Sequence, residues 1–172
     1  MSLHATGLSR CRRPDETGVT IIELMVVVGI MAIVIALGLP NFIDWNARYR
    51  LKQAVTELHG NLNIARMLAM NRNTTVAVQI AAGVVDPADG KQKITATFTD
   101  AAGGVVLPPQ RMRPEIRTLA GAAAIQFNSR GLRSGGGTGI QTIQLTNVKG
   151  ITYEIQVTAA GKARWCPISP CP

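Results

Sequence analysis

The stretch that decides the fold is TGVTIIELMVVVGIMAIVIALGLP, residues Thr17 to Pro40. From Val19 to Leu39, a single residue, Glu23, is charged. A helix rises about 1.5 Å per residue, so residues 19–39 would span roughly 30 Å, the thickness of the hydrocarbon core of a bilayer. We therefore expect a transmembrane helix at 19–39. Basic residues precede it, which favours a cytoplasmic N-terminus and places the remainder of the chain on the far side of the membrane. These are Arg10, Arg12 and Arg13.

Glu23 needs an explanation, because a carboxylate inside hydrocarbon is costly and usually functional. The segment 19–39 holds no Lys or Arg that could neutralise it. Cleavage of the Gly18–Val19 bond would create an α-amino group at the start of the helix, with Glu23 as the fifth residue of the new chain. In a bundle of such helices, the carboxylate of one subunit could meet the amine of its neighbour. We therefore interpret Glu23 as a group that sets the register of assembly.

Two simpler interpretations of the segment are weaker. A secretory signal peptide would have a shorter apolar run followed by an A-x-A-like cleavage site, which is missing here. A plain single-pass anchor accounts for the apolar run but leaves Glu23 unexplained.

The basic leader, Gly18, Glu23, the apolar run and Pro40 together resemble the class III signal of type IV pilins and pseudopilins. The resemblance implies that residues 1–18 are a leader removed by a membrane-bound prepilin peptidase. The peptidase would then methylate the new N-terminus at Val19, where the family usually has Phe. Glu23 would be the subunit-docking carboxylate. Pro40 matches the position where the helix kinks, since proline lacks a backbone donor and clashes with the preceding turn.

A second helical pattern follows Pro40. Apolar residues recur at steps of three or four and predict an amphipathic helix over residues 40–70. They are Ile43, Ala47, Leu51, Val55, Leu58, Leu62, Ala65 and Ala69. Its other face carries charges that we interpret as solvated: Arg48, Arg50, Lys52 and Arg66. His59 has no catalytic companion and is expected to be structural.

Residues 71–172 are predicted to form a β-rich globular domain, because the apolar period changes from 3.6 to 2 after residue 73. Strands are predicted at 74–80, 93–100, 124–129, 140–147 and 152–160. Residues 81–92 suggest a turn region, 101–114 an irregular segment with at most one short strand, and 130–139 a glycine-rich hairpin loop. The expected fold class is α+β, a long N-terminal helix packed on antiparallel sheets.

Three segments narrow the resemblance to the FimT/GspH branch of pseudopilins. They are LNIARMLAMNRNTTVAV (62–78), IQFNSRGLRSGGG (125–137) and VTAAGKARWC (157–166). FimT is a minor pilin of the type IV pilus, and GspH is its counterpart in type II secretion. In FimT-like proteins the final strand leads into a G-R-x-R motif implicated in DNA binding. The matching residues here are Gly161, Lys162, Ala163 and Arg164, with lysine replacing the first arginine.

The charge distribution agrees with an anionic partner. The chain has a formal net charge of +8 and a pI near 10.1. Residues 101–172 contain eight basic residues against two acidic ones. A surface with this bias could bind phosphates in a salt-sensitive, sequence-independent way, and the resemblance to FimT-like proteins makes double-stranded DNA the candidate partner. The candidate residues are Lys162, Arg164, Arg130 and Arg133. Alternatively, the charges only keep the domain soluble; likewise Trp165 either stacks on a base or packs in the core.

Cys166 and Cys171 lie close together near the C-terminus, and we predict a disulfide between them. Such a bridge implies an oxidising compartment. Two free thiols or half of a metal site are the alternatives, although the C-terminal region offers no other Cys or suitable His to complete a zinc site.

Catalysis is not expected. The glycine-rich loop lacks the G-K-[ST] ending of a phosphate-binding loop, the serines have no His partner in the domain, and no metal-ligand spacing is present. No cofactor is therefore expected.

The sequence thus predicts a structural minor pilin of a type IV pilus, with DNA capture as a further task. Its expected partners are other pilins, the prepilin peptidase, the inner membrane and DNA, and its C-terminal domain is expected in the periplasm. The alternatives are a type II secretion pseudopilin and a plain bitopic membrane protein with a binding domain.

Overall fold

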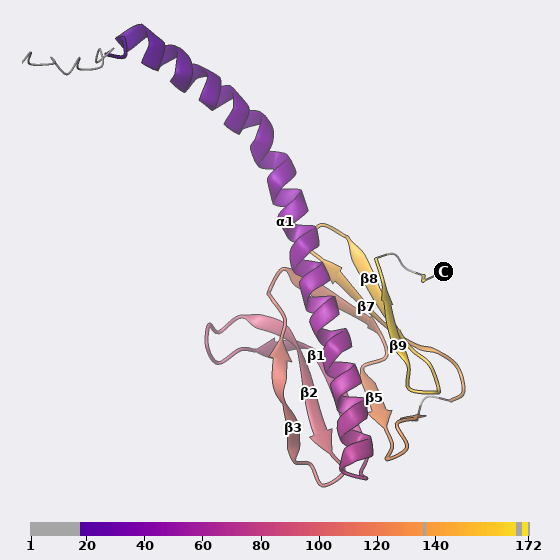
Figure 1. Ribbon diagram of the computed structural model, residues 1–172. Helices are drawn as coiled ribbons and strands as arrows, with labels where there is room; N and C mark the ends of the chain where they lie inside the picture. Colours follow the sequence, from indigo (N-terminus) through magenta and orange to yellow (C-terminus); the bar gives the residue numbers. More distant parts are fainter. Residues whose placement is uncertain (1–17, 136, 168–169, 172) are drawn as a thin grey trace, which may run out of the picture. The chain divides into compact units, whose positions relative to one another are not determined.

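The computed structural model describes residues 18–135, 137–167 and 170–171. The chain divides into two compact units, Met1–Pro40 and Asn41–Pro172. One helix, α1 (Ile21–Asn71), contributes to both units. The strands that follow it in the described residues are β1 (Val76–Val85), β2 (Gln92–Asp100), β3 (Val105–Arg111), β4 (Ile116–Gly121), β5 (Ala124–Phe127), β6 (Arg133–Ser134), β7 (Gln141–Asn147), β8 (Thr152–Val157) and β9 (Ala163–Cys166) (Figure 1).

The first unit contains the start of α1. The N–H of Glu23 donates to Thr20 Oγ1 at 3.3 Å, so Thr20 caps the helix. Thr and Glu at this spacing form the sequence pattern of a capping box. From Ile21 to Leu37 every large apolar side chain is between 53% and 83% exposed. This part of the chain therefore buries little of its apolar surface in the isolated molecule.

Among the described residues, no helix is long and apolar enough to cross a membrane unbroken, while segments 21–37 and 42–71 satisfy that test as a bent pair, by length and composition only. The transmembrane helix at 19–39 stays a prediction. The helix continues through position 40, and the kink at Pro40 likewise stays a prediction. The predicted leader, residues 1–18, lies outside the described residues except for Gly18.

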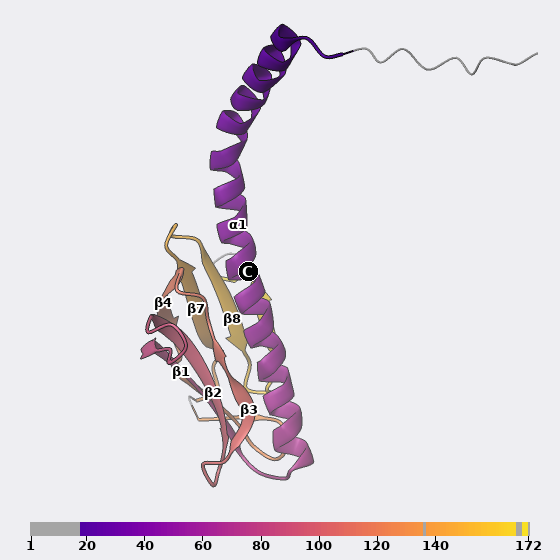
Figure 2. The same ribbon diagram turned by 90° about the vertical axis from the view of Figure 1, so that its left-hand side faces the viewer.

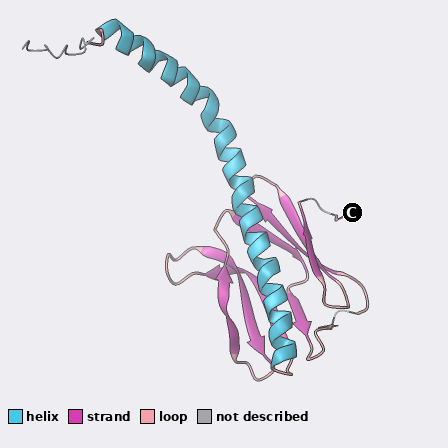
Figure 3. Ribbon diagram, viewed as in Figure 1, coloured by secondary structure: helices cyan, strands magenta, loops and turns pink. Residues whose placement is uncertain are grey.

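The second unit packs the remainder of α1 on two antiparallel sheets. The strand orders are β3-β2-β1-β5-β6 and β4-β7-β8-β9. This part of the helix runs in front of the strands in Figure 1, and the view turned by 90° shows the strands on one side of it (Figure 2). The colouring by secondary structure shows that this unit is otherwise strands and short connections (Figure 3). The predicted α+β architecture is confirmed.

The predicted apolar stripe of the helix forms the centre of the core. Six of its residues have no exposed surface: Leu51, Val55, Leu58, Leu62, Ala65 and Ala69. They pack in one cluster with apolar side chains from both sheets, among them Phe98, Phe127 and Ile155. Ile43, which belongs to the same predicted stripe, is 55% exposed because it precedes the part of the helix that the sheets cover.

Several strands differ from the prediction. Residues 81–85, predicted as a turn, continue β1 past a register shift between Ala81 and Val84. Gly83, within that irregularity, has a φ of 75°, a conformation that favours glycine. Strands β4 and β9 were not predicted, and β6 lies inside the predicted hairpin loop. Strand β3 extends over seven residues, although it contains two prolines and its pairing with β2 has register shifts. It lies at a sheet edge, where proline is tolerated.

Candidate functional site

Two tight turns lie at one end of the C-terminal unit. In residues 128–132, Asn128 Oδ1 accepts the N–H groups of Arg130 and Leu132, both at 3.0 Å. In residues 158–162, the N–H of Thr158 donates to the carbonyl of Lys162 at 3.0 Å. The side chains of Arg130 and Lys162 are exposed. Each turn therefore presents one cation from a backbone fixed by hydrogen bonds.

The two turns touch each other through their glycines. Gly131 and Gly161 have φ values of 71° and 73°. A Cβ added at Gly161 would lie 2.1 Å from the carbonyl oxygen of Gly131, too close for any side chain. The fold thus brings the segments 125–137 and 157–166 side by side, which their separation in the sequence does not reveal.

Arg66 ties both turns to the helix. Its Nε donates to the carbonyl of Gly131 at 2.8 Å, and one terminal nitrogen donates to the carbonyl of Ala160 at 3.2 Å. The prediction that Arg66 belongs to a solvated face is wrong, because its guanidinium bonds to carbonyls of both turns. We call Arg66 with the turns 128–132 and 158–162 the two-turn site.

Two further predicted DNA-binding residues have other surroundings. Arg133 is buried, and its guanidinium donates to the carbonyls of Gly135 at 2.6 Å, Gly137 at 2.9 Å, and Gly139. The guanidinium therefore holds the glycine-rich loop through hydrogen bonds to its carbonyl groups. Arg164 lies on β9, is exposed, and donates through Nε to Gln156 Oε1 at 2.8 Å.

Trp165 and His59, which were also considered from the sequence, both make contacts within the folded unit. The ring of Trp165 stacks on Tyr153, with centroids 5.9 Å apart and an interplanar angle of 18°, and packs against the core. This placement supports packing and not base stacking. A ring nitrogen of His59 lies 3.2 Å from the carbonyl oxygen of Ala163, so His59 joins the helix to β9.

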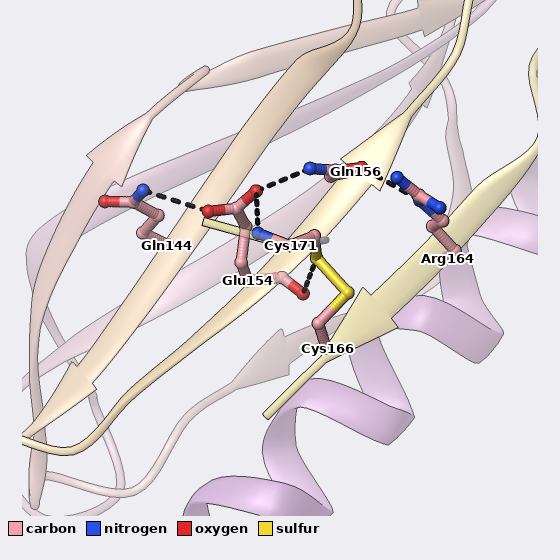
Figure 4. Close-up of a disulfide and its surroundings, with 6 residues drawn as sticks. All are labelled: Gln144, Glu154, Gln156, Arg164, Cys166 and Cys171. Atoms are coloured by element: carbon pink, nitrogen blue, oxygen red, sulfur yellow. Dashed lines mark hydrogen bonds between the residues drawn. A yellow bond between two sulfur atoms is a disulfide. The ribbon is translucent and has the colours of Figure 1, made fainter. Parts of the chain in front are cut away.

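The predicted disulfide is present between Cys166 and Cys171, whose Cα atoms are 5.7 Å apart. It holds Cys171 beside a carboxylate, Glu154 (Figure 4). Glu154 is buried, with 1% of its surface exposed. Gln144 donates to Glu154 Oε2 at 3.1 Å, and Gln156 donates to Oε1 at 2.8 Å. The N–H of Cys171 reaches the same Oε1 at 3.5 Å. A polar network thus lies beneath the disulfide-closed tail.

A charge cluster stands at the turn between β1 and β2. Lys93 Nζ lies 2.7 Å from Asp86 Oδ2 and 2.8 Å from Asp89 Oδ2. The hydrogen bond from Lys93 lowers the pKa of each carboxyl, and these bonds raise the pKa of the Lys93 ammonium. The ammonium therefore offsets the charge of the acidic turn. In the described part of the chain, no group of three His, Cys, Asp or Glu side chains could hold a metal ion.

A comparison with models of known protein families identifies the family to which the second unit is similar. The model of the family described as type II transport protein GspH matches residues 54–161, from the buried half of the helix to the second turn of the two-turn site. The chain belongs to the GspH family. A second model, the prokaryotic N-terminal methylation motif, matches residues 13–39, which contain Gly18 and Glu23.

Pilins are among the relatives of this GspH-family chain. It is 30% identical over 91 residues to a fimbrial protein of Neisseria meningitidis serogroup A. The aligned region covers 53% of this chain and 53% of that protein. It is 47% identical over 45 residues to the type IV major pilin PilA of Myxococcus xanthus, covering 26% of this chain and 20% of that protein. The chain thus spans about half or less of the length of these relatives.

The fold also has a solved counterpart. The crystal structure of the type IV minor pilin FimU of Pseudomonas aeruginosa superimposes with a TM-score of 0.52 at 17% identity, over 73% of this chain and 94% of that chain. The GspH-family chain therefore has the pilin fold. The predicted resemblance to minor pilins and pseudopilins, which are families of structural subunits, is confirmed.

Proposed function

We propose that this protein is a minor pilin of a type IV pilus, made as a membrane-anchored precursor and built into the fibre through its N-terminal helix. The observation that carries the proposal is the exposed apolar surface of residues 21–37. The C-terminal unit already has a complete core without it. A surface this apolar requires either lipid or the helices of neighbouring subunits around it.

Processing follows from the residues at the start of the helix. Cleavage after Gly18 would leave a methylated amine on Val19, with Glu23 in the first turn of the capped helix. Within the described residues, the carboxylate of Glu23 has no hydrogen-bonding or ionic partner. The amine of a neighbouring subunit would supply that partner on assembly, so insertion into the fibre would neutralise both charges together.

A type II secretion pseudopilin is the alternative, and the description of the matching family model supports it. The fimbrial and type IV pilin relatives support the pilus. Both functions use the same processing and the same helix, so processing alone does not separate them.

Expression with a prepilin peptidase tests the shared part of the proposal. Mass spectrometry should find a mature chain that begins at N-methylated Val19, and Gly18→Asp should leave the precursor intact. Uncleaved wild-type chain would overturn the proposal. Recovery in sheared surface fibres would then favour the pilus. Loss of an exported enzyme on deletion of the gene, with normal fibres, would favour secretion.

DNA capture is a second proposed task, supported by the two-turn site. Arg130 and Lys162 are exposed on turns that touch, and Arg164 is exposed on the adjoining strand. These cations lie on turns and a strand and not on a helix suited to a DNA groove, so we expect phosphate contacts without sequence readout. Arg133 is left out because its guanidinium is bonded inside the glycine-rich loop.

A salt series with duplex DNA and residues 41–172, which contain the whole core, tests this task. Arg130→Ala/Lys162→Ala should weaken binding by about tenfold and lower the salt slope by about two. The control Lys52→Ala/Lys91→Ala removes the same charge from exposed positions elsewhere. Equal weakening by both pairs would show that only net charge matters and would overturn the assignment to the two-turn site.

A further inference from the structure

Aromatic residues are scarce in this chain but gather at one place on α1. The full sequence has two Trp, two Tyr and three Phe, and three of these seven fall between residues 42 and 49. Phe42 and Trp45 are each 60% exposed, and Tyr49 is 57% exposed. The ring centroids of Phe42 and Trp45 are 6.1 Å apart, and those of Trp45 and Tyr49 are 5.8 Å apart. We call these three residues the aromatic stripe.

The aromatic stripe faces away from the core of its own unit. Its residues follow each other at steps of three and four, so they share one side of the helix. At about 100° per residue, this side lies nearly opposite the buried side that carries Leu51 and Val55. The sheets pack on the buried side and leave the stripe uncovered. Its partner must therefore come from outside the unit.

The chemistry of the stripe and its neighbours narrows the partner. Trp and Tyr combine an apolar ring with a polar tip and gather where hydrocarbon meets water. Arg48 and Lys52 are exposed beside the rings and form no ion pair within the described residues. Arg50 and Asp44 differ, since they pair with Glu115 at 2.6 Å and Lys149 at 3.1 Å. Two uncompensated cations beside amphipathic rings are complementary to a layer of anionic phospholipid headgroups.

We propose that the aromatic stripe anchors the unassembled subunit in the headgroup layer of the far leaflet, with Arg48 and Lys52 just outside it and attracted to its anionic surface. The inference rests on the proposed membrane location of residues 19–39. Trp45 follows Leu39 by six residues, so its backbone lies roughly 9 Å along the helix, slightly beyond a headgroup layer roughly 5–7 Å thick. Helical side chains lean toward the N-terminus of their helix, so the indole ring reaches back into that layer. Packing against the helix of a second copy would instead desolvate the polar tips and the two cations. The stripe thus fixes the depth of the subunit, and extraction into a fibre must break this contact.

Trp45 itself reports on this contact. In the full chain carrying Trp165→Phe, Trp45 is the remaining tryptophan. The protein is placed in vesicles that contain an anionic phospholipid, and quenching is compared between lipids brominated near the headgroup and near the chain end. The control Trp45→Phe/Thr56→Trp/Trp165→Phe moves the probe three turns along the same side of the helix, beyond the bilayer surface. Protease protection shows separately whether residues 19–39 are inserted.

The expected result is that the shallow quencher acts on Trp45 about twofold more strongly than the deep one, while the indole of the control variant is quenched by neither. Insertion of 19–39 with Trp45 unquenched would overturn the anchor alone. Shielding of Trp45 only at high protein density would also overturn it, by identifying a second copy as the partner. If 19–39 is not inserted, both the anchor and the proposed function fail.

Discussion

Glu23 lies in an apolar segment and Glu154 is buried in the folded unit, but the two carboxyl groups differ in their hydrogen-bonding partners. Glu154 is buried on β8 and receives hydrogen bonds from Gln144, Gln156 and the N–H of Cys171. Glu23 stands in an apolar segment. Its backbone N–H donates to Thr20 Oγ1, but its carboxylate has no partner among the residues that the structure describes. A carboxyl group whose hydrogen bonds the fold satisfies avoids the penalty of a buried polar group without partners. A charge that it leaves unsatisfied needs a partner from outside, and that need makes it a candidate for assembly.

The strongest test of the comparison removes the charge without an internal partner. Glu23→Val should reduce incorporation into fibres to background, because the subunit loses the partner for its neighbour's amine. Membrane insertion and the melting temperature of the C-terminal unit should not change. Shear fractions and immunoblots measure this, with Ile22→Val as the adjacent control. Normal incorporation of Glu23→Val would show that Glu23 does not dock the subunit, and the contrast with Glu154 would then have no functional meaning.

Glu154→Leu makes the converse change. It keeps the bulk of the side chain but removes the carboxylate to which Gln144 and Gln156 donate, so we expect a loss of about 2–4 kcal/mol in the free energy of unfolding. Denaturant titration of residues 41–172 measures it, beside Glu57→Leu on the exposed helix surface. Equal, small losses in both variants would mean that the buried network contributes little. Assembly of the residual folded protein should be normal.

Arg66, like Glu154, has hydrogen-bonding partners within the fold, although its side chain is less buried. Arg66→Met removes its donors from the carbonyls of Gly131 and Ala160, and we expect a loss of about 1–2 kcal/mol. Amide hydrogen exchange should accelerate in the two turns and remain unchanged in β1. Arg72→Met, an exposed change just after α1, provides the control. Unchanged exchange in both turns would show that they hold each other without the helix.

The cluster around Lys93 should give the smallest effect, with a distinct dependence on pH. The lowered pKa of Asp86 means that its stabilising contribution is present above its ordinary value of 3.8 and is lost as pH falls through the folded value. The raised pKa of Lys93 means that its contribution is present below 10.5 and is lost as pH rises through the folded value.

Lys93→Met should therefore lower the melting temperature at neutral pH, and the difference from wild type should shrink in strong acid and strong base. Lys91→Met, an exposed neighbour, controls for net charge. A difference that stays constant across the whole pH range would show that packing of the Lys93 side chain, and not its charge, is responsible.

The parts of the fold with a clear period could be predicted from the sequence. The helix stripe from Leu51 to Ala69 and the alternation in β2 both mark faces that meet the core. β9 was not predicted, because a strand of four residues is too short to show a clear alternation of apolar and polar side chains. Glu154 escaped because alternation in TYEIQV suggests a solvent face, whereas the disulfide-closed tail covers that face.

The candidate site divides in the same way. The sequence identified Arg130 and Arg133 as equal candidates in one glycine-rich stretch. Only the fold distinguishes them, because it directs Arg130 to solvent and surrounds Arg133 with carbonyls. Contact between the two turns depends on long-range pairing and left no local signal. The disulfide was predictable because both cysteines lie within a few residues of each other.

The contact between His59 and β9 has a consequence for how the protein is made. It joins residues 104 positions apart, and β9 lies at the very end of the second sheet. Pairings this distant form slowly, since the closure of a long loop precedes the contact. The helix is synthesised before β9 and gains this contact only after residues 163–166 have been made. The unit therefore completes its folding after β9 has been synthesised, and the disulfide then ties this strand to Cys171.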